Sequence, residues 1–290
     1  MKHLQNFRKK YQLSPKADLS SVSVAVESLC EANDIAYEFL ANIDPKDSKE
    51  GFVIHTHLNI LGRIFEQTMG MLVCIATQCF TSSEAVSRVV VEGSINLIYM
   101  ASKGNESTLI GFIDSWLIEH KKKLEELKSN MHGKNYEVSV NSMIDERLQL
   151  MGMFENLVNG IVSQCGITRK PHREVWPKSL FDRFSTLGRE TDYYESYHRL
   201  SGSSHLSGED TLIWHMTLDA SLEQKIKVGK EAVAYSTMMS RIASTFFIDA
   251  ATACSLYHGH KSPAEFEKLK NDLIKSIAEI AKAAGVPTSI

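Results

Sequence analysis

The chain lacks the motifs that mark the common classes of nucleotide-binding proteins and hydrolases. It contains no GxxxxGK[ST] or GxGxxG loop, which disfavours sites for ATP, GTP and dinucleotides. It has no GxSxG motif, which would place the nucleophile of an α/β-hydrolase. Its five cysteines include no CxxC pair, and an odd number without regular spacing is typical of reduced thiols in a cytoplasmic protein.

The chain also lacks a large surplus of charge and a long uninterrupted apolar run. Its formal net charge of -3 provides no general attraction to nucleic acid or to an anionic membrane, so binding to RNA would need a local basic patch. The apolar run at 69–80 is too short to cross a bilayer, and the run at 232–257 carries Arg241 and Asp249. No apolar segment follows the basic N-terminus, so we expect no signal peptide, no membrane segment and a cytoplasmic location.

The pattern of apolar residues predicts an all-α fold, because nearly every segment has helical rather than alternating periodicity. We expect one helical domain over 1–290, a bundle of long helices with a small loop-rich insertion around 166–190. The basic, proline-containing stretch at 166–177 is the alternative boundary between two parts. Helix 221–258 is apolar on almost every side and rich in small residues, which predicts a central position. The expected helices are 16–43, 51–79, 82–103, 106–131, 136–165, 178–187, 190–200, 221–258 and 263–284.

Helix 82–103 is apolar except for one polar seam. At about 100° per residue, Arg88, Glu92 and Tyr99 fall on the same side of the helix. Arg88 and Glu92 are spaced to pair as i,i+4 neighbours. Two interpretations remain open: an internal ion pair that fixes helix packing, or a polar face that supports a site built by other elements. We expect Arg88 and Glu92 to be largely buried and to contact each other or residues of the 193–205 segment.

The histidines do not indicate a metal site. His55 and His57 are two residues apart, and on a helix such residues point in different directions. His258 and His260 flank Gly259, a pattern typical of a helix end. We therefore expect no metal and no cofactor.

Arg199 and His205 form the one candidate catalytic pair. They lie where a tyrosine-rich helical segment gives way to a loop of serine and glycine. Beside an RNA backbone, an imidazole moves the proton of a ribose hydroxyl and a guanidinium stabilises charge on the phosphate, so no metal is needed. Tyr197, His198 and Ser201 lie beside the pair and are candidate supporting residues, together with Arg88, Glu92 and Tyr99.

Two segments of the chain resemble a helical family known as the domain of unknown function 5677. In the first, SRVVVEGSINLIY at 87–99, the family's Arg-x3-Glu and following apolar-aromatic run match Arg88, Glu92 and Tyr99. The second segment runs from Trp176-Pro177 to His205, and its matching residues are Gly188, Tyr193, Tyr197, Ser201 and His205. The resemblance covers roughly 80–210 and implies an all-helical fold but no established activity.

The spacing of Arg199 and His205 is also similar to the Arg-x(4–6)-His motif of the HEPN superfamily of helical ribonucleases and toxins. This resemblance implies a metal-independent endoribonuclease of a toxin or antiviral defence system, with RNA as substrate. Such enzymes pair their motifs across a homodimer. The alternative from a different class is a non-enzymatic helical interaction or regulatory module, in which 193–205 packs internally or binds a partner protein.

Overall fold

The computed structural model describes residues 2–204 and 208–285, and no strand occurs among them. The all-α prediction is therefore confirmed for the described part of the chain. The elements are α1 (Lys2–Lys10), α2 (Ser20–Ala41), α3 (Ser48–Ala76), α4 (Phe80–Ser102), α5 (Glu106–Asn130), α6 (Glu137–Gln164), α7 (His172–Val175), α8 (Leu180–Thr186), α9 (Glu190–Asp192), the π-helix η1 (Tyr193–His198), α10 (Arg199–Ser204), α11 (Gly208–Leu218), α12 (Leu222–Tyr257) and α13 (Ala264–Ala284).

Each expected helix has a counterpart, but α1, α7 and α11 lie where no helix was predicted. The four residues of α7 fit between two prolines of the 166–177 stretch, because Pro171 precedes the helix and Pro177 follows Trp176. In α11 the apolar side chains do not gather on one face, so its sequence has no clear helical period.

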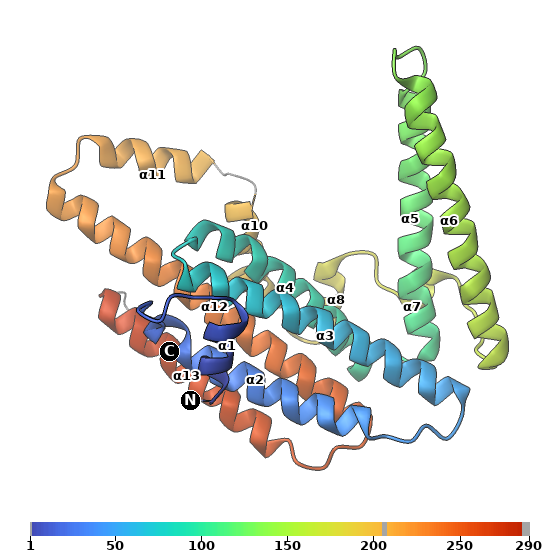
Figure 1. Ribbon diagram of the computed structural model, residues 1–290, viewed down its shortest axis with the longest axis horizontal. Coiled ribbons are helices and arrows are strands. Elements are labelled where there is room, and N and C mark those ends of the chain that lie inside the picture. The colour runs from blue at the N-terminus through green and yellow to red at the C-terminus, as the bar shows by residue number, and fades with distance from the viewer. Residues whose placement is uncertain (1, 205–207, 286–290) are drawn as a thin grey trace. The chain divides into compact units, whose positions relative to one another are not determined.

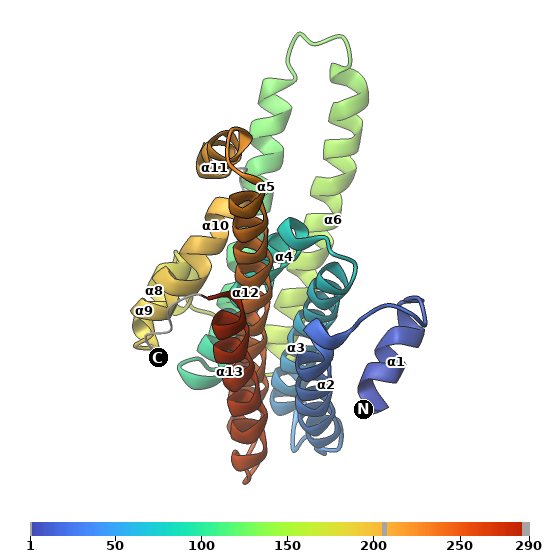
Figure 2. The same cartoon turned by 90° about the vertical axis from the view of Figure 1, so that its left-hand side faces the viewer.

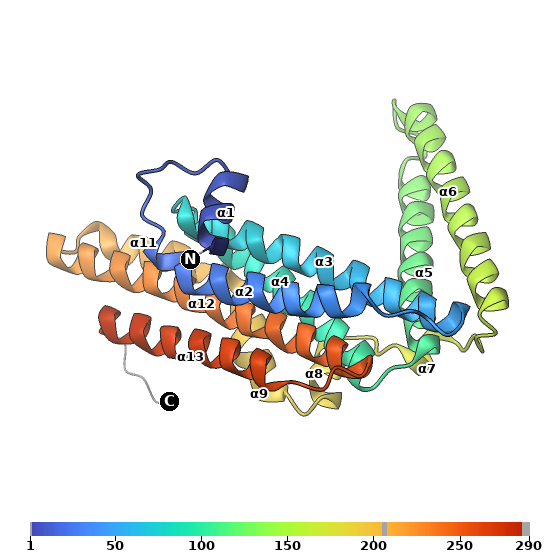
Figure 3. The same ribbon diagram turned by 60° about the horizontal axis from the view of Figure 1, so that its bottom comes forward.

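The first compact unit comprises Met1–Ile43, His57–Ser102 and Leu180–Ile290. Its centre is α12, which packs against α2, α4 and α13 (Figure 3). Small, fully buried residues of α12, such as Ala243, Ser244 and Ala250, allow these close approaches. The predicted central position is confirmed for α12 from Ala234 onward, where its buried residues begin. At the N-terminus, α1 returns beside α2 and buries Phe7 in the same core (Figure 2).

The second compact unit comprises Asp44–Thr56 and Lys103–Ser179. Its main feature is an antiparallel pair formed by α5 and α6 (Figure 1). Arg169 fixes the segment after α6, because its guanidinium binds both carboxylate oxygens of Asp114 at 2.8 and 2.5 Å. The prediction of a single domain stays a prediction. The core of this unit consists of Ile110, Leu117, Met151, Val158 and Ile167.

Helix α3 is, among the described residues, the one helix long and apolar enough to cross a membrane. Its most apolar 18-residue window has a mean hydropathy of 1.2 and is 39% buried. Core helices of folded proteins meet the same criteria, and Leu61, Met71 and Leu72 of α3 are buried in the core of the first unit. Length and composition alone are therefore weak evidence for a membrane span.

Gly111 provides a test of the packing inside the second unit. A Cβ atom at Gly111 on α5 would collide with the side chain of Val175 on α7. We expect Gly111→Ala to lower the free energy of unfolding by about 1–3 kcal/mol, because the branched valine has little room to move. The matched control is Gly152→Ala on α6, where nothing lies within 4 Å and alanine gains up to about 1 kcal/mol of helix propensity. The melting temperatures are measured by circular dichroism. Equal melting temperatures for the two variants would contradict the packing of α7 on Gly111.

Candidate functional site

The tyrosine-rich segment contains a π-helix, η1, between α9 and α10. A π-helix bonds each N–H to the carbonyl five residues back, is rare, and occurs frequently at functional sites. Within it, the hydroxyl of buried Ser196 donates to the carbonyl of Asp192, four residues earlier. Such a hydroxyl competes with the regular helical ladder and bends helices. Tyr193 anchors the start of η1 by packing against Phe181 and Phe184 of α8.

Tyr197 connects η1 to the polar seam of α4. Nη2 of Arg88 donates to the Tyr197 hydroxyl at 2.9 Å, and this hydroxyl lies 3.3 Å from Oε2 of Glu92, to which it donates. The Arg88 guanidinium also lies 4.8 Å from the centre of the Tyr197 ring. All three side chains are half-buried. The expected contact of Arg88 and Glu92 with the 193–205 segment is confirmed. The expectation that both side chains are largely buried is wrong, because each is half-buried.

Arg183 of α8 and Tyr99 of α4 belong to the same electrostatic cluster. Burial lowers the pKa of Arg183, and the charge of Glu92 opposes that change. Burial raises the pKa of Tyr99, and the charge of Arg183 only partly offsets this increase. Burial is also the main reason that the pKa of Tyr197 is raised, so its hydroxyl keeps the proton that it donates to Glu92. We refer to these five residues as the polar cluster: Arg88, Glu92, Tyr99, Arg183 and Tyr197.

The structure places Arg199 on the surface directly after η1. Arg199 and His198 are exposed, whereas the next residue, Leu200, is fully buried in the core. Ser201 donates a hydrogen bond to the carbonyl of Tyr197 at 3.1 Å. His205 lies outside the described residues. The catalytic and supporting roles expected for these side chains stay predictions.

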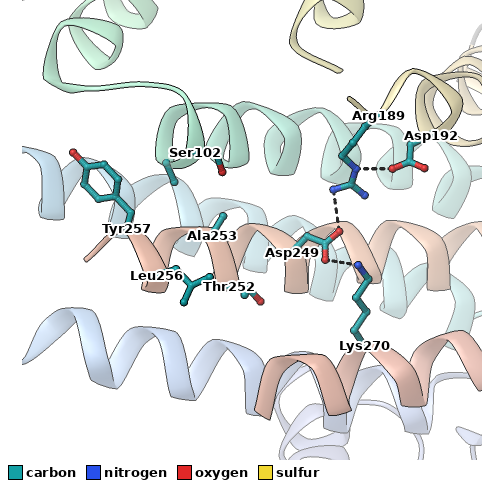
Figure 4. Close-up of a pocket in the computed structure, with 10 residues that line it drawn as sticks. Ser102, Arg189, Asp192, Asp249, Thr252, Ala253, Leu256, Tyr257 and Lys270 are labelled. Carbon is teal, nitrogen blue, oxygen red and sulfur yellow. Dashed lines mark hydrogen bonds and ion pairs between the residues drawn. The ribbon is translucent and has the colours of Figure 1, made fainter. Parts of the chain in front are cut away.

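A pocket of about 740 Å³ lies beside the start of the same segment, lined by residues of α4, α12, α13 and the α8–α9 region (Figure 4). Arg189 binds Asp249 at 2.9 Å and Asp192 at 2.5 Å, and Asp249 also binds Lys270 at 2.7 Å. The Arg189 guanidinium packs 4.6 Å from the ring centre of Phe246. Two cations therefore face two carboxylates, and this ion-pair network links α9, α12 and α13 rather than attracting an anion. Of the four charged residues in this network, only Asp249 was noted from the sequence, as a charge inside the apolar run at 232–257.

One group of potential metal ligands occurs among the described residues, formed by His57, Cys254 and His258. It combines one histidine from each of the two His-x-His pairs. The sequence prediction of no metal site considered each pair alone, and the structure brings the pairs together across α3 and α12. His258 is the C-cap of α12, as the pattern around Gly259 predicted.

These observations define an all-helical protein in which a polar cluster holds a π-helix against a core helix. The model of the family of unknown function DUF5677 matches residues 55–219, and the chain belongs to this family. The match includes both resembling segments, and with them the polar cluster and Arg199. No curated protein and no solved structure matches the chain.

The Tyr197 hydroxyl gives a direct test of the polar cluster. Tyr197→Phe keeps the ring over Arg88 but removes the donor to Glu92, so we expect the free energy of unfolding to fall by about 1–3 kcal/mol. Tyr194→Phe is the matched control, because Tyr194 lies on the same π-helix with 56% of its surface exposed. Equal unfolding curves in urea for the two variants would show that the bridge contributes no stability.

Proposed function

We propose that the chain is a metal-independent ribonuclease in which Arg199 and His205 are the catalytic pair. The observation that supports this most is the exposure of Arg199 next to two anchored residues, Tyr197 and Leu200. A guanidinium on a fixed backbone provides a preorganised positive charge for a phosphate. The similarity of the Arg-x5-His spacing to HEPN ribonucleases supports the same assignment.

The proposed reaction is an internal transesterification. His205 accepts the proton of a ribose 2′-hydroxyl, whose oxygen attacks the adjacent phosphorus. The bond from phosphorus to the 5′-oxygen breaks, that oxygen takes a proton from water, and a 2′,3′-cyclic phosphate remains. Arg199 stabilises the negative charge on the phosphate oxygens during this step.

The remaining predicted residues have supporting roles in this proposal. Arg88 and Glu92 position Tyr197, and Tyr99 lies in the same polar cluster. Ser201 strengthens the turn that follows η1, and exposed His198 is available to an RNA strand. No cofactor is needed. The proposed setting is the cytoplasm, in a toxin or antiviral defence system.

A homodimer belongs to this proposal because the similar ribonucleases pair their motifs across two subunits. The surface that follows His205 supports it: neither α11 nor the first turns of α12, up to Val233, contain a residue described as buried. Exposed apolar patches on a protein mark interaction sites. The exposed apolar residues, here named the α11–α12 apolar surface, are Leu212, Ile213, Trp214, Met216, Leu218, Leu222, Ile226 and Val233.

RNA cleavage in excess EDTA tests the catalytic pair. We expect wild-type protein to cleave a panel of single-stranded and structured RNAs, and Arg199→Ala and His205→Ala each to lose about 10²–10⁴-fold in rate. Arg199→Ala should melt like wild type, because Arg199 is exposed. Arg173→Ala and His132→Ala are matched controls at exposed positions and should keep full activity.

Dimerisation through the α11–α12 apolar surface is tested by light scattering. Trp214 and Met216 have 60% and 78% of their surfaces exposed, so their replacement by serine removes apolar contact area without disturbing the core. We expect each replacement to weaken the dimer by at least about tenfold, as central interface residues do. Met143→Ser, at a 69% exposed position of α6, should leave the dimer unchanged. A wild-type protein that is monomeric throughout would contradict the dimer.

The second candidate function is a non-enzymatic interaction module, and the same apolar surface favours it. In this case 193–205 is a packing or partner-binding segment. Tyr197→Ala would then reduce stability or partner binding more than His205→Ala does. Wild-type protein that leaves every RNA of the panel intact, also together with the products of neighbouring genes, would decide for the module.

A further inference from the structure

Two helices that are distant in the sequence bring three metal-ligating side chains together inside the first unit. Cys254 and His258 are four residues apart at the C-terminal end of α12, so their side chains lie on the same face of that helix. His57 approaches them from α3. One donor atom of each residue lies within 4.8 Å of the other two.

His57 is buried in contact with His258. Only 1% of its surface is exposed, and its Nδ1 lies 3.1 Å from Nε2 of His258. One of these two nitrogens must carry a proton if they share a hydrogen bond. Nε2 of His57, on the other side of the ring, is buried without a hydrogen-bond partner. Nδ1 is therefore the ring nitrogen that faces another donor atom.

We propose that His57, Cys254 and His258 bind a zinc ion. Two imidazole nitrogens and one thiolate are the donors that Zn²⁺ prefers, whereas Mg²⁺ and Ca²⁺ take oxygen ligands. In a tetrahedral zinc site with Zn–N bonds of about 2.0–2.1 Å, two ligand nitrogens lie about 3.3 Å apart, close to the separation of 3.1 Å found here. The group supplies three protein ligands, which leaves the fourth position to water or to another small ligand.

Burial favours the metal-binding form of His57 and opposes that of Cys254. Burial lowers the pKa of His57 to about 3, with a further contribution from His258, so the His57 imidazole is neutral and can donate a lone pair. Burial raises the pKa of the Cys254 thiol to about 12. Zinc therefore has to displace the thiol proton, which is released to solvent as the Zn–S bond forms.

The surroundings supply orientation and access. The ring of Tyr257 packs edge-on against both imidazoles, with centroid distances of 5.2 Å to His57 and 4.8 Å to His258. His57 and Cys254 are fully buried, whereas His258 is half-buried and gives an ion a route from solvent. The bound ion would connect α3 directly to the end of α12. This site is separate in sequence from Arg199, and two of its three residues lie beyond the family match, which ends at residue 219.

Binding of Co²⁺, the spectroscopic substitute for Zn²⁺, tests the proposal. We expect full-length wild-type protein to bind one Co²⁺ per chain with a thiolate-to-cobalt charge-transfer band, and Zn²⁺ to displace it and raise the melting temperature. Cys254→Ser should remove the band. The matched controls are Cys79→Ser and His55→Gln, which change an exposed thiol and an exposed imidazole outside the group and should keep the band.

If Cys254→Ser does not fold, His258→Gln replaces it, because His258 is half-buried at the helix end. This variant should weaken zinc binding at least about tenfold, as loss of a ligand or even of its supporting partner does. The proposal is overturned if wild-type protein shows no band and no zinc-dependent rise in melting temperature. It is also overturned if the band persists in Cys254→Ser or in His258→Gln with unchanged affinity.

Discussion

The hydroxyl of Tyr197, shared between Arg88 and Glu92, holds the tyrosine-rich segment against α4 within the first unit. Because α4 packs in the core, its half-buried charges at Arg88 and Glu92 need polar partners. Tyr197 meets this need with its hydroxyl and its ring at the same time. Its position in turn fixes the backbone that leads to Arg199.

The π-helix allows three side chains of this segment to reach different neighbours. Tyr193 has to reach the aromatic side chains of α8, Tyr197 has to reach α4, and Leu200 has to enter the core. A regular α-helix advances 100° per residue, and the wider π turn changes that phase. At the start of the same segment, Arg189 is held by Asp192 and Asp249. The segment is thus fixed at both ends before the chain reaches His205.

Local patterns were sufficient to predict much of the fold. The helical wheel of 82–103 placed Arg88 and Glu92 on one polar side, and one of the two partners expected for them, the 193–205 segment, is the one found. The small residues of 221–258 predicted a central helix. Helix α11 was missed because its apolar residues point to several sides, which removes the periodic signal. The link between Arg189, Asp249 and Lys270 joins residues far apart in the sequence, and no local pattern specifies such a link.

The histidine pairs show the same limit of local reasoning. His57 was set aside because a helix turns neighbouring histidines apart, and that argument is correct for His55 and His57 taken together. The partner of His57 is His258, 201 residues later, which only the packing of α3 on α12 reveals. In the same way, the Arg199–His205 pair was chosen from local features, its spacing and its position between a helical segment and a Ser/Gly loop. The structure adds the exposure of Arg199 and its anchored neighbours, while His205 lies outside the described residues.

The chemistry of the RNA ends tests the central claim most directly. Transesterification by Arg199 and His205 uses the 2′-hydroxyl, so a substrate with one 2′-deoxyribose at the cleavage position should remain intact there. Products from the unmodified RNA should carry 2′,3′-cyclic phosphates, identified by mass spectrometry. Cleavage of the deoxy-substituted site at the normal rate, or products with 3′-hydroxyl and 5′-phosphate ends, would contradict the account.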